Sequence, residues 1–204
     1  MSADEEVPFE TRYESRDGLT VRLDAAPRTG ANGRSYTHHR LVVADGRAGA
    51  AILATRGQEV LLVRSYRASV GRDLWELPRG AGDLADRDAD PSEPELVTGV
   101  RELREETGYT ATRARLIGRY VVDSTVFPQG MGVVRCEIGA GVEPEETDGE
   151  VSEVRWFTDV EVRRLIREGV IADANSLSGL AIWLAADGGV EGFDGAEGLE
   201  GAEE

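Results

Sequence analysis

Lysine is absent from this sequence, and cysteine and histidine are scarce. The 204 residues include one cysteine and two histidines, and every strongly basic side chain is an arginine. The single cysteine, Cys136, excludes an intramolecular disulfide framework and fits a reducing compartment. Because Cys136 lies in the apolar run 132–138, we expect a buried structural thiol rather than a nucleophile.

Net positive charge and long apolar runs are also lacking. The formal net charge is -16 and the sequence pI is about 4.6, which argues against nucleic acids and anionic membranes as partners. No apolar stretch is long enough to span a bilayer, and residues 1–10 lack the basic and apolar regions of a signal peptide. We therefore expect a cytoplasmic protein. An anionic phosphate substrate would need a local metal ion or arginine cluster to reverse the field.

The order of the predicted elements indicates an α+β fold of one domain. Alternating and apolar runs predict strands at 20–23, 37–43, 49–55, 59–65, 115–122, 132–138 and 151–157. Helices are predicted at 159–168 and 175–186, the second capped by Asn175. The chain divides into N-terminal strands and a turn (1–36), a main domain (37–186) and an acidic, glycine-rich tail expected to be disordered (187–204).

The segment from Trp75 to Tyr109 contains a helix with its start and stop signals. Ser92 is suited to cap the helix, and Glu95 follows it at the spacing of a capping box. Gly108 is suited to the left-handed turn that ends a helix. These signals predict a helix from Glu93 to Thr107.

The predicted helix has two chemically different faces. The face expected to pack on the core consists of Leu96, Val100, Leu103 and Thr107. The acidic side consists of Glu95, Glu102, Glu105 and Glu106. Like charges one turn apart repel, and a divalent cation such as Mg²⁺ or Mn²⁺, which prefers oxygen ligands, would compensate them. The alternative is a solvated helix face in a very acidic chain.

The same segment resembles the Nudix box of the Nudix hydrolases. That pattern reads Gly, five residues, Glu, seven residues, then Arg-Glu-apolar-x-Glu-Glu-x-Gly-apolar. From its first Glu onward, the matching positions are Glu93, Arg101, Glu102, Leu103, Glu105, Glu106, Gly108 and Tyr109. Upstream, residues 76–80 (ELPRG) resemble the usual approach to the box.

One departure from the pattern lies before the helix. Twelve residues separate Gly80 from Glu93, where the pattern has five. We interpret the seven extra residues as an insertion in an acidic loop, Asp83 to Asp90, because closing a longer loop costs little. Either Gly80 or Gly82 then takes the place of the glycine in the pattern.

The resemblance implies a fold and a metal site. It implies the Nudix α/β/α sandwich, with a mixed sheet and the box helix, over the main domain. By their positions in the motif, Glu102 and Glu106 would be the principal Mg²⁺ ligands, and Glu105 would bind a second metal or take the proton of the attacking water. The main-chain carbonyl of Arg79 would complete the coordination. Arg101 would pair with Glu93 or Glu105.

Residues outside the box resemble those of ADP-ribose and ADP-sugar pyrophosphatases. Arg67 matches the arginine of the Gln-Tyr-Arg pattern found there, although Ser65 replaces the glutamine. Arg67 and Arg79 are the expected substrate-binding arginines, since a guanidinium binds phosphate through two parallel hydrogen bonds. An ion-pairing role for Arg67 is the alternative. The resemblance also places a catalytic base in the loop near residue 150, where we prefer Glu150 to Glu146 and Glu153.

Together these features predict a Mg²⁺-dependent Nudix pyrophosphatase, with Mn²⁺ as an alternative ion. Its substrate would be a small nucleotide, a nucleoside diphosphate linked to another group as in ADP-ribose, cleaved at the pyrophosphate bond. Alternatives are a housecleaning nucleoside triphosphate pyrophosphatase and a non-catalytic nucleotide-sensing module. Similar enzymes are often dimers that share N-terminal strands, so a homodimer is possible.

Overall fold

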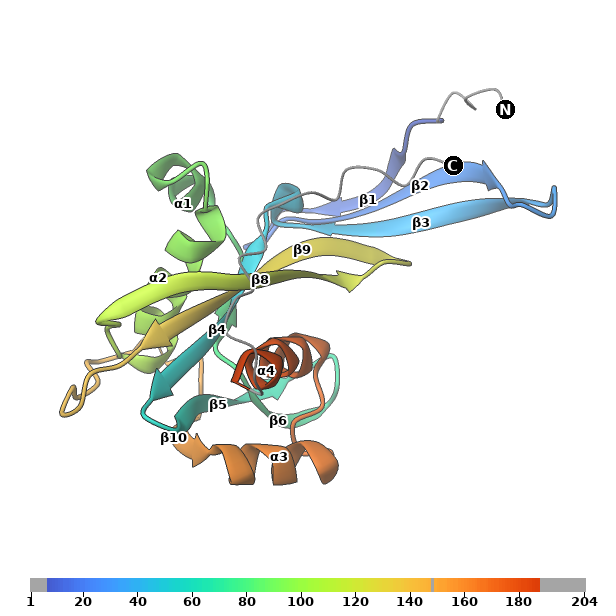
Figure 1. Cartoon of the computed structure of the whole chain (residues 1–204). Coiled ribbons are helices and arrows are strands. Elements are labelled where there is room, and N and C mark those ends of the chain that lie inside the picture. The colour runs from blue at the N-terminus through green and yellow to red at the C-terminus, as the bar shows by residue number, and fades with distance from the viewer. Residues whose placement is uncertain (1–6, 148, 188–204) are drawn as a thin grey trace, which may run out of the picture.

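The computed structural model describes residues 7–147 and 149–187, which form two sheets and four α-helices (Figure 1). The three-stranded sheet has the order β1-β2-β3, and the seven-stranded sheet has the order β10-β5-β4-β9-β8, with β6 paired to β5 and β7 paired to β4. The strands are β1 (Glu10–Ser15), β2 (Val21–Thr29), β3 (Ser35–Val43), β4 (Gly49–Arg56), β5 (Glu59–Arg67), β6 (Arg72–Glu76), β7 (Arg79–Gly80), β8 (Arg113–Asp123), β9 (Phe127–Glu137) and β10 (Glu153–Thr158). The helices are the 3₁₀ turn η1 (Ala44–Gly46), α1 (Leu84–Ala89), α2 (Pro94–Thr107), α3 (Asp159–Arg167) and α4 (Ala174–Asp187).

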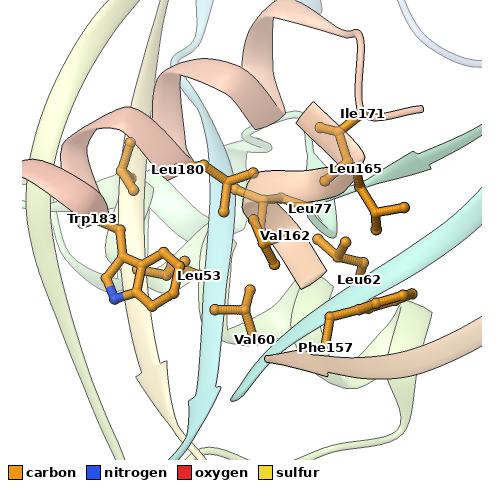
Figure 2. Packing of buried hydrophobic residues seen from close by; sticks show 11 residues of the cluster. Leu53, Val60, Leu62, Leu77, Phe157, Val162, Leu165, Ile171, Leu180 and Trp183 are labelled. Carbon is orange, nitrogen blue, oxygen red and sulfur yellow. The ribbon is translucent and has the colours of Figure 1, made fainter. Parts of the chain in front are cut away.

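Helices cover both faces of the larger sheet, which is mixed because β4 runs parallel to β9 while its other pairs are antiparallel. Alternate residues of a strand point to opposite faces, so Leu53 of β4 packs toward α3 and α4, whereas Ile52 packs toward α2. The cluster on the α3–α4 side is shown in Figure 2, where Leu53 and Val60 lie beneath Leu180 and Trp183. The expected α/β/α arrangement is therefore present.

The N-terminal sheet extends away from the larger sheet as an arm (Figure 1). Its strand β2 continues to Thr29, although we predicted a strand only at 20–23. The chain tolerates Pro27 within β2, which lies between β1 and β3, because Pro27 falls past the end of the β1 pairing. At the base of the arm, the Leu41 amide donates to the Val126 carbonyl at 2.7 Å.

The helix α2 is rotated relative to the predicted orientation. Val100 was expected in the core but is 39% exposed, whereas Glu95 and Glu106 are buried. The reason is the small residue Gly99, which lies so close to β9 that an added Cβ would be 2.8 Å from the Val134 side chain. A helix can approach a sheet this closely only at a small residue. A prediction based on the positions of large apolar residues does not detect such a contact.

The predicted capping box of α2 is also wrong. Glu93 is the N-cap residue and makes no side-chain cap hydrogen bond, and Pro94 occupies the first turn. The hydroxyl and amide of Ser92 instead donate to Asp90 Oδ1 at 2.6 and 2.9 Å. The fixed φ of proline suits the first helical position, so Pro94 begins the helix two residues after Ser92.

The segment predicted as an acidic loop, Asp83 to Asp90, contains the short helix α1. Asp83 caps it, because its side chain accepts from the Asp86 amide at 2.8 Å and the Asp86 side chain accepts from the Asp83 amide at 3.2 Å. The short side chain of aspartate accepts hydrogen bonds from nearby backbone amides. For this reason aspartates are frequent both in loops and at the first residue of a helix.

Smaller differences concern other elements and the ends of the chain. Asp173, not Asn175, accepts the Ser176 amide at the start of α4, at 2.9 Å. Residues 1–6 and 188–204 lie outside the described residues, and with them all of the predicted tail (187–204) except Asp187, which ends α4. Within the described part of the chain, no helix combines the length and apolar character that a membrane crossing requires.

Replacing Gly108 by alanine is expected to destabilise the fold by about 2–4 kcal/mol. Gly108 ends α2 at φ 71°, and a Cβ there would lie 2.2 Å from the main-chain oxygen of Glu145. Gly141→Ala is the matched control, because φ is 78° but no atom lies within 4 Å. It should cost only about 1–2 kcal/mol. Urea unfolding of both variants measures the difference, and equal losses would contradict the close contact.

Candidate functional site

The carboxylate of Glu106 is buried where α2 meets β7. Its side chain faces β7, and the residue is only 5% exposed. The Arg79 main-chain amide donates to Glu106 Oε2 at 3.1 Å. This bond fixes the ELPRG segment against the helix, so Glu106 is held at one place.

Glu102 lies one turn before Glu106 and directly over Gly80. A Cβ built on Gly80 would lie 1.8 Å from the Glu102 carboxyl carbon, so only glycine leaves room for this carboxylate. Gly82 has a different role, because its Cβ would meet the main-chain oxygen of Ala48 at 2.2 Å. The structure therefore places Gly80, rather than Gly82, beneath the acidic helix.

Arg101 connects the carboxylates of α2 to the segment before the helix. Its Nη1 contacts Glu102 Oε1 at 2.8 Å and donates to Glu105 Oε2 at 2.7 Å. Its Nη2 donates to the Ala81 carbonyl at 3.2 Å and to Asp86 Oδ2 at 2.9 Å. Of the two partners expected for Arg101, Glu105 is found; in the part of the chain that the structure describes, Glu93 is not among its hydrogen-bond or ion-pair partners.

Glu150 lies in the loop before β10. Its charge contributes to raising the pKa of both Glu102 and Glu106. Glu153 faces Arg64 instead, at 3.7 Å. Of the three loop acids considered as bases, Glu150 is the one whose charge raises the pKa of both Glu102 and Glu106.

The remaining candidate, Glu146, lies with Glu105 on the outer side of α2. There the two acids border a hollow of about 750 Å³, which Leu96, Val97 and Val100 also line. Arg101 and Arg104 also line this hollow, but Glu102 and Glu106 do not. We therefore place the chemistry at Glu102 and Glu106 rather than in the hollow.

We define the acidic cluster as Glu102, Glu105, Glu106 and Glu150, and two of its members, Glu102 and Glu106, have raised pKa values. Burial raises the pKa of Glu106 to about 8, and the nearby charges of Glu102 and Glu150 act in the same direction against the Arg79 amide. Burial also raises the pKa of Glu102, with Arg101 opposing it. Two crowded carboxylates with raised pKa values are typical of a functional site.

Beside the acidic cluster lies an arginine pair held by a buried acid. Glu76 is completely buried, and its Oε2 accepts from Arg67 Nε at 2.8 Å and from Arg79 Nη2 at 3.3 Å. Burial lowers the pKa of Arg67, but Glu76 and, to a smaller extent, Glu106 raise it overall. Arg67 is thus both ion-paired and close to the acidic cluster. We did not predict the role of Glu76, which precedes the box in an apolar context.

The arginine pair borders a cavity of about 220 Å³. Gly80 and Ala81 form its side toward the acidic cluster, and the arm reaches its opposite side. The other lining residues, mostly apolar, are Leu19, Val43, Val122, Phe127, Gln129, Met131 and Asn175. A ligand in this cavity would touch arginines at one end and apolar side chains at the other.

The acidic cluster fits a divalent cation by its donor chemistry. Hard cations such as Mg²⁺ bind carboxylate oxygens, and they stabilise the charged form of crowded acids. Across residues 7–147 and 149–187, however, no three acidic, histidine or cysteine side chains are placed to hold one metal together. Arg101 is the counter-ion of Glu102 and Glu105 in this arrangement.

Comparison with known proteins identifies the family. The NUDIX domain matches residues 45–177, more than half of the chain. The chain belongs to the Nudix family. This membership and the expected α+β Nudix fold are confirmed, and with them the expectation of a Nudix hydrolase at the level of the family.

Two relatives have names that indicate their substrates. An ADP-ribose pyrophosphatase of Mycobacterium tuberculosis (strain ATCC 25618 / H37Rv) is 31% identical over 125 residues, covering 58% of this chain and 56% of that protein. The match thus spans about half the length of that relative. A CMP-5'-(N-acetyl-N-hydroxy-3-aminopropyl)phosphonate hydrolase of Streptomyces rubellomurinus (strain ATCC 31215) is 30% identical over 159 residues, covering 76% of this chain and 72% of that protein.

A solved structure shows the same fold. The crystal structure of an ADP compounds hydrolase superposes with a TM-score of 0.65 at 19% sequence identity. The match covers 92% of this chain and 99% of that chain. At this identity the likeness concerns the fold alone.

Within the Nudix box, Asp86 is the residue that our sequence interpretation missed. We assigned it to an inserted loop, but it is 3% exposed and pairs with Arg101. The signal was in the spacing, since five residues separate Gly80 from Asp86, as the first gap of the box requires. The extra residues therefore lie between Asp86 and Glu93. Both residues match the first acid of the box: Asp86 by its distance from Gly80, and Glu93 by its distance from Arg101.

Proposed function

We propose that this chain is a Mg²⁺-dependent Nudix pyrophosphatase that hydrolyses a nucleoside diphosphate linked to another group. The proposal is based on one observation: the acidic cluster and the cavity with the arginine pair meet at Gly80. On one side lie two carboxylates with raised pKa values, the half-buried Glu102 and the buried Glu106, and on the other lies the cavity with its arginine pair. A diphosphate bridging the two would present its reacting phosphorus to the acidic cluster.

The acidic cluster would hold Mg²⁺, or Mn²⁺ as the alternative. Glu102 and Glu106 would be the main ligands, with the Arg79 carbonyl completing the set and Glu105 available for a second ion. The ion supplies charge neutralisation and lowers the pKa of bound water. The Arg79 amide already orients Glu106, and Gly80 leaves room for Glu102.

Glu150 would accept the proton of the attacking water, with Glu105 as the second candidate. The water oxygen forms a bond to one phosphorus while the bond from that phosphorus to the bridging oxygen breaks. The leaving phosphate takes the electron pair of that bond, and the proton passes to the carboxylate. Position supports Glu150, because its charge acts on both Glu102 and Glu106.

Arg67 and Arg79 would bind the substrate phosphates. Glu76 neutralises part of their charge, so the arginine pair offers about one net positive charge in a chain of charge -16. Apolar Val122, Phe127 and Met131 would then contact the nucleoside or the sugar. The names of the two relatives support a nucleotide linked through phosphorus to a second group, and ADP-ribose is the first compound to test.

A substrate panel tests this function. The purified chain with Mg²⁺ should convert ADP-ribose to AMP and ribose 5-phosphate, identified by mass. Its kcat/KM for ADP-ribose should exceed that for ATP at least about tenfold, because pocket contacts discriminate by that order. Faster release of pyrophosphate from nucleoside triphosphates would favour the housecleaning alternative. Binding without release of any product would favour a nucleotide sensor.

Two further expectations concern the assembly and location of the protein. A homodimer and a cytoplasmic location remain predictions. Light scattering of the purified chain measures its molar mass and therefore tests the homodimer.

A further inference from the structure

Asn175 lies in the first turn of α4 and lines the cavity that contains the arginine pair. The residue is only 8% exposed. The hydroxyl of Tyr120, on β8, donates to Asn175 Oδ1 at 2.8 Å. Because this bond holds the oxygen of the amide, it also fixes the direction of the nitrogen. The orientation of the Asn175 amide is therefore set by β8.

The Nδ2 group is the side of this amide that faces the cavity. Within residues 7–147 and 149–187, it donates to no side chain or main-chain carbonyl, and other atoms do not enclose it. Buried polar side chains are normally hydrogen-bonded, so a nearly buried amide with free hydrogens points to a partner outside the chain. A ligand in the cavity can supply that acceptor.

Gln129 presents the opposite polarity to the same cavity. Its Nε2 donates to the Arg47 carbonyl at 2.8 Å, which leaves Oε1 as the free end of the amide. Oε1 is buried and accepts no hydrogen bond from the described residues. The cavity thus offers one oriented donor and one oriented acceptor. A hydroxyl can donate and accept, so neighbouring hydroxyls of one ligand can satisfy both amides.

The group that reaches these amides is defined by the arginine pair. In a nucleoside diphosphate linked to ribose, a sugar follows the phosphates on each side. Arg67 and Arg79 line the same cavity of about 220 Å³ as the two amides. Phosphates bound by these arginines therefore bring a sugar, with its hydroxyls, to Asn175.

We propose that Asn175 is a specificity-determining residue that donates to a hydroxyl oxygen of the sugar next to the substrate phosphates. Tyr120 is the positioning residue that fixes the direction of the amide. Gln129 would accept from a neighbouring hydroxyl. The inference rests on the proposed function, because it assumes that Arg67 and Arg79 bind the phosphates.

ADP-ribose analogues that each lack one hydroxyl of either ribose test this role in the presence of Mg²⁺. For the unsubstituted chain, removal of one particular hydroxyl should lower kcat/KM about tenfold, the value of one hydrogen bond. Asn175→Leu should lower kcat/KM for ADP-ribose by a similar factor. It should also distinguish ADP-ribose from that analogue by less than about twofold, because the substitution and the analogue remove the same bond.

Asn32→Leu is the matched control. Asn32 is the other asparagine of the chain and lies exposed in the turn between β2 and β3. This variant should keep the tenfold preference of the unsubstituted chain, because its side chain does not line the cavity.

Two further variants separate recognition from stability. Asn175→Leu leaves the Tyr120 hydroxyl without its partner, so thermal unfolding is measured for each variant. If this variant is not folded, Asn175→Leu combined with Tyr120→Phe replaces both partners by apolar groups of similar shape and should show the same loss of preference. Tyr120→Phe alone keeps the donor but frees its direction, and it should retain only part of the preference.

The possible failures are distinguishable. A folded Asn175 variant that still prefers ADP-ribose tenfold over the same analogue would overturn the role of Asn175, and full preference in Tyr120→Phe would overturn the positioning role of Tyr120. Equal turnover of ADP-ribose and every analogue by the unsubstituted chain would overturn the inference but leave the proposed function intact. Failure to hydrolyse any nucleoside diphosphate sugar would overturn both.

Discussion

Glu106→Gln is expected to lower kcat about a thousandfold, the usual cost of removing one preorganised charge from a catalytic site. The amide oxygen of glutamine can still accept the Arg79 main-chain amide, so the ELPRG segment should stay in place. What is lost is the negative charge that would bind the cation. Initial rates with ADP-ribose and Mg²⁺ measure the change. Glu145→Gln is the control, because Glu145 is 62% exposed at its side chain and pairs with Arg104 away from the cavity.

The same substitution should change how stability depends on pH. The pKa of Glu106 is about 8 in the folded chain and close to 4.5 when unfolded, so between these values the folded state binds more protons. The contribution of Glu106 to the free energy of unfolding is therefore fully present below pH 4.5, and it is lost as the pH rises through 8. Glu106→Gln has no such loss, since an amide does not titrate in this range.

Urea unfolding at pH 5 and pH 9 in the presence of a chelator measures this effect. The unsubstituted chain should lose on the order of 2 kcal/mol more than Glu106→Gln between the two pH values, a figure discounted for solvent penetration. Added Mg²⁺ should reduce the difference, because a cation stabilises the charged form. Parallel pH curves for the two proteins would contradict the buried position of Glu106.

The family and the layers of the fold could be predicted from the sequence because they depend on local patterns. Apolar runs predicted the strands β4 and β5, and the structure buries residues on both of their faces. The box motif predicted that Glu102 and Glu106 lie one turn apart, and the structure places them together beside Gly80. These features require only the periodicity of strands and helices.

Contacts between distant segments were harder to predict. The orientation of α2 depends on Gly99 approaching Val134, which no hydrophobic pattern records. Glu76 lies in an apolar stretch, and its partner Arg67 belongs to the preceding strand. Asp86 was assigned to solvent because acidic residues are usually exposed. In each case a polar or small residue is buried by a partner that only the folded chain brings near it.

Gly80 offers the sharpest test of the site, because its effect should be confined to one carboxylate. An alanine Cβ at this position would overlap the Glu102 carboxyl group, with a separation of 1.8 Å. The overlap involves the end of a flexible side chain, and Gly80 does not have a positive φ. Glu102 can therefore rotate away, and the free energy of unfolding should change by about 1 kcal/mol or less.

Turnover by Gly80→Ala should fall about a hundredfold, since a displacement of roughly 1 Å at a reacting centre has effects of this size. Gly130→Ala is the matched control, because Gly130 has no atom within 4 Å of an added Cβ, and its turnover should be unchanged. In a Glu102→Gln background, Gly80→Ala should reduce turnover by less than about twofold, because both substitutions remove the same carboxylate from the site. A full hundredfold loss in that background would show that Gly80 acts on something other than Glu102, and the assignment of Glu102 as a principal ligand would lose its geometric support.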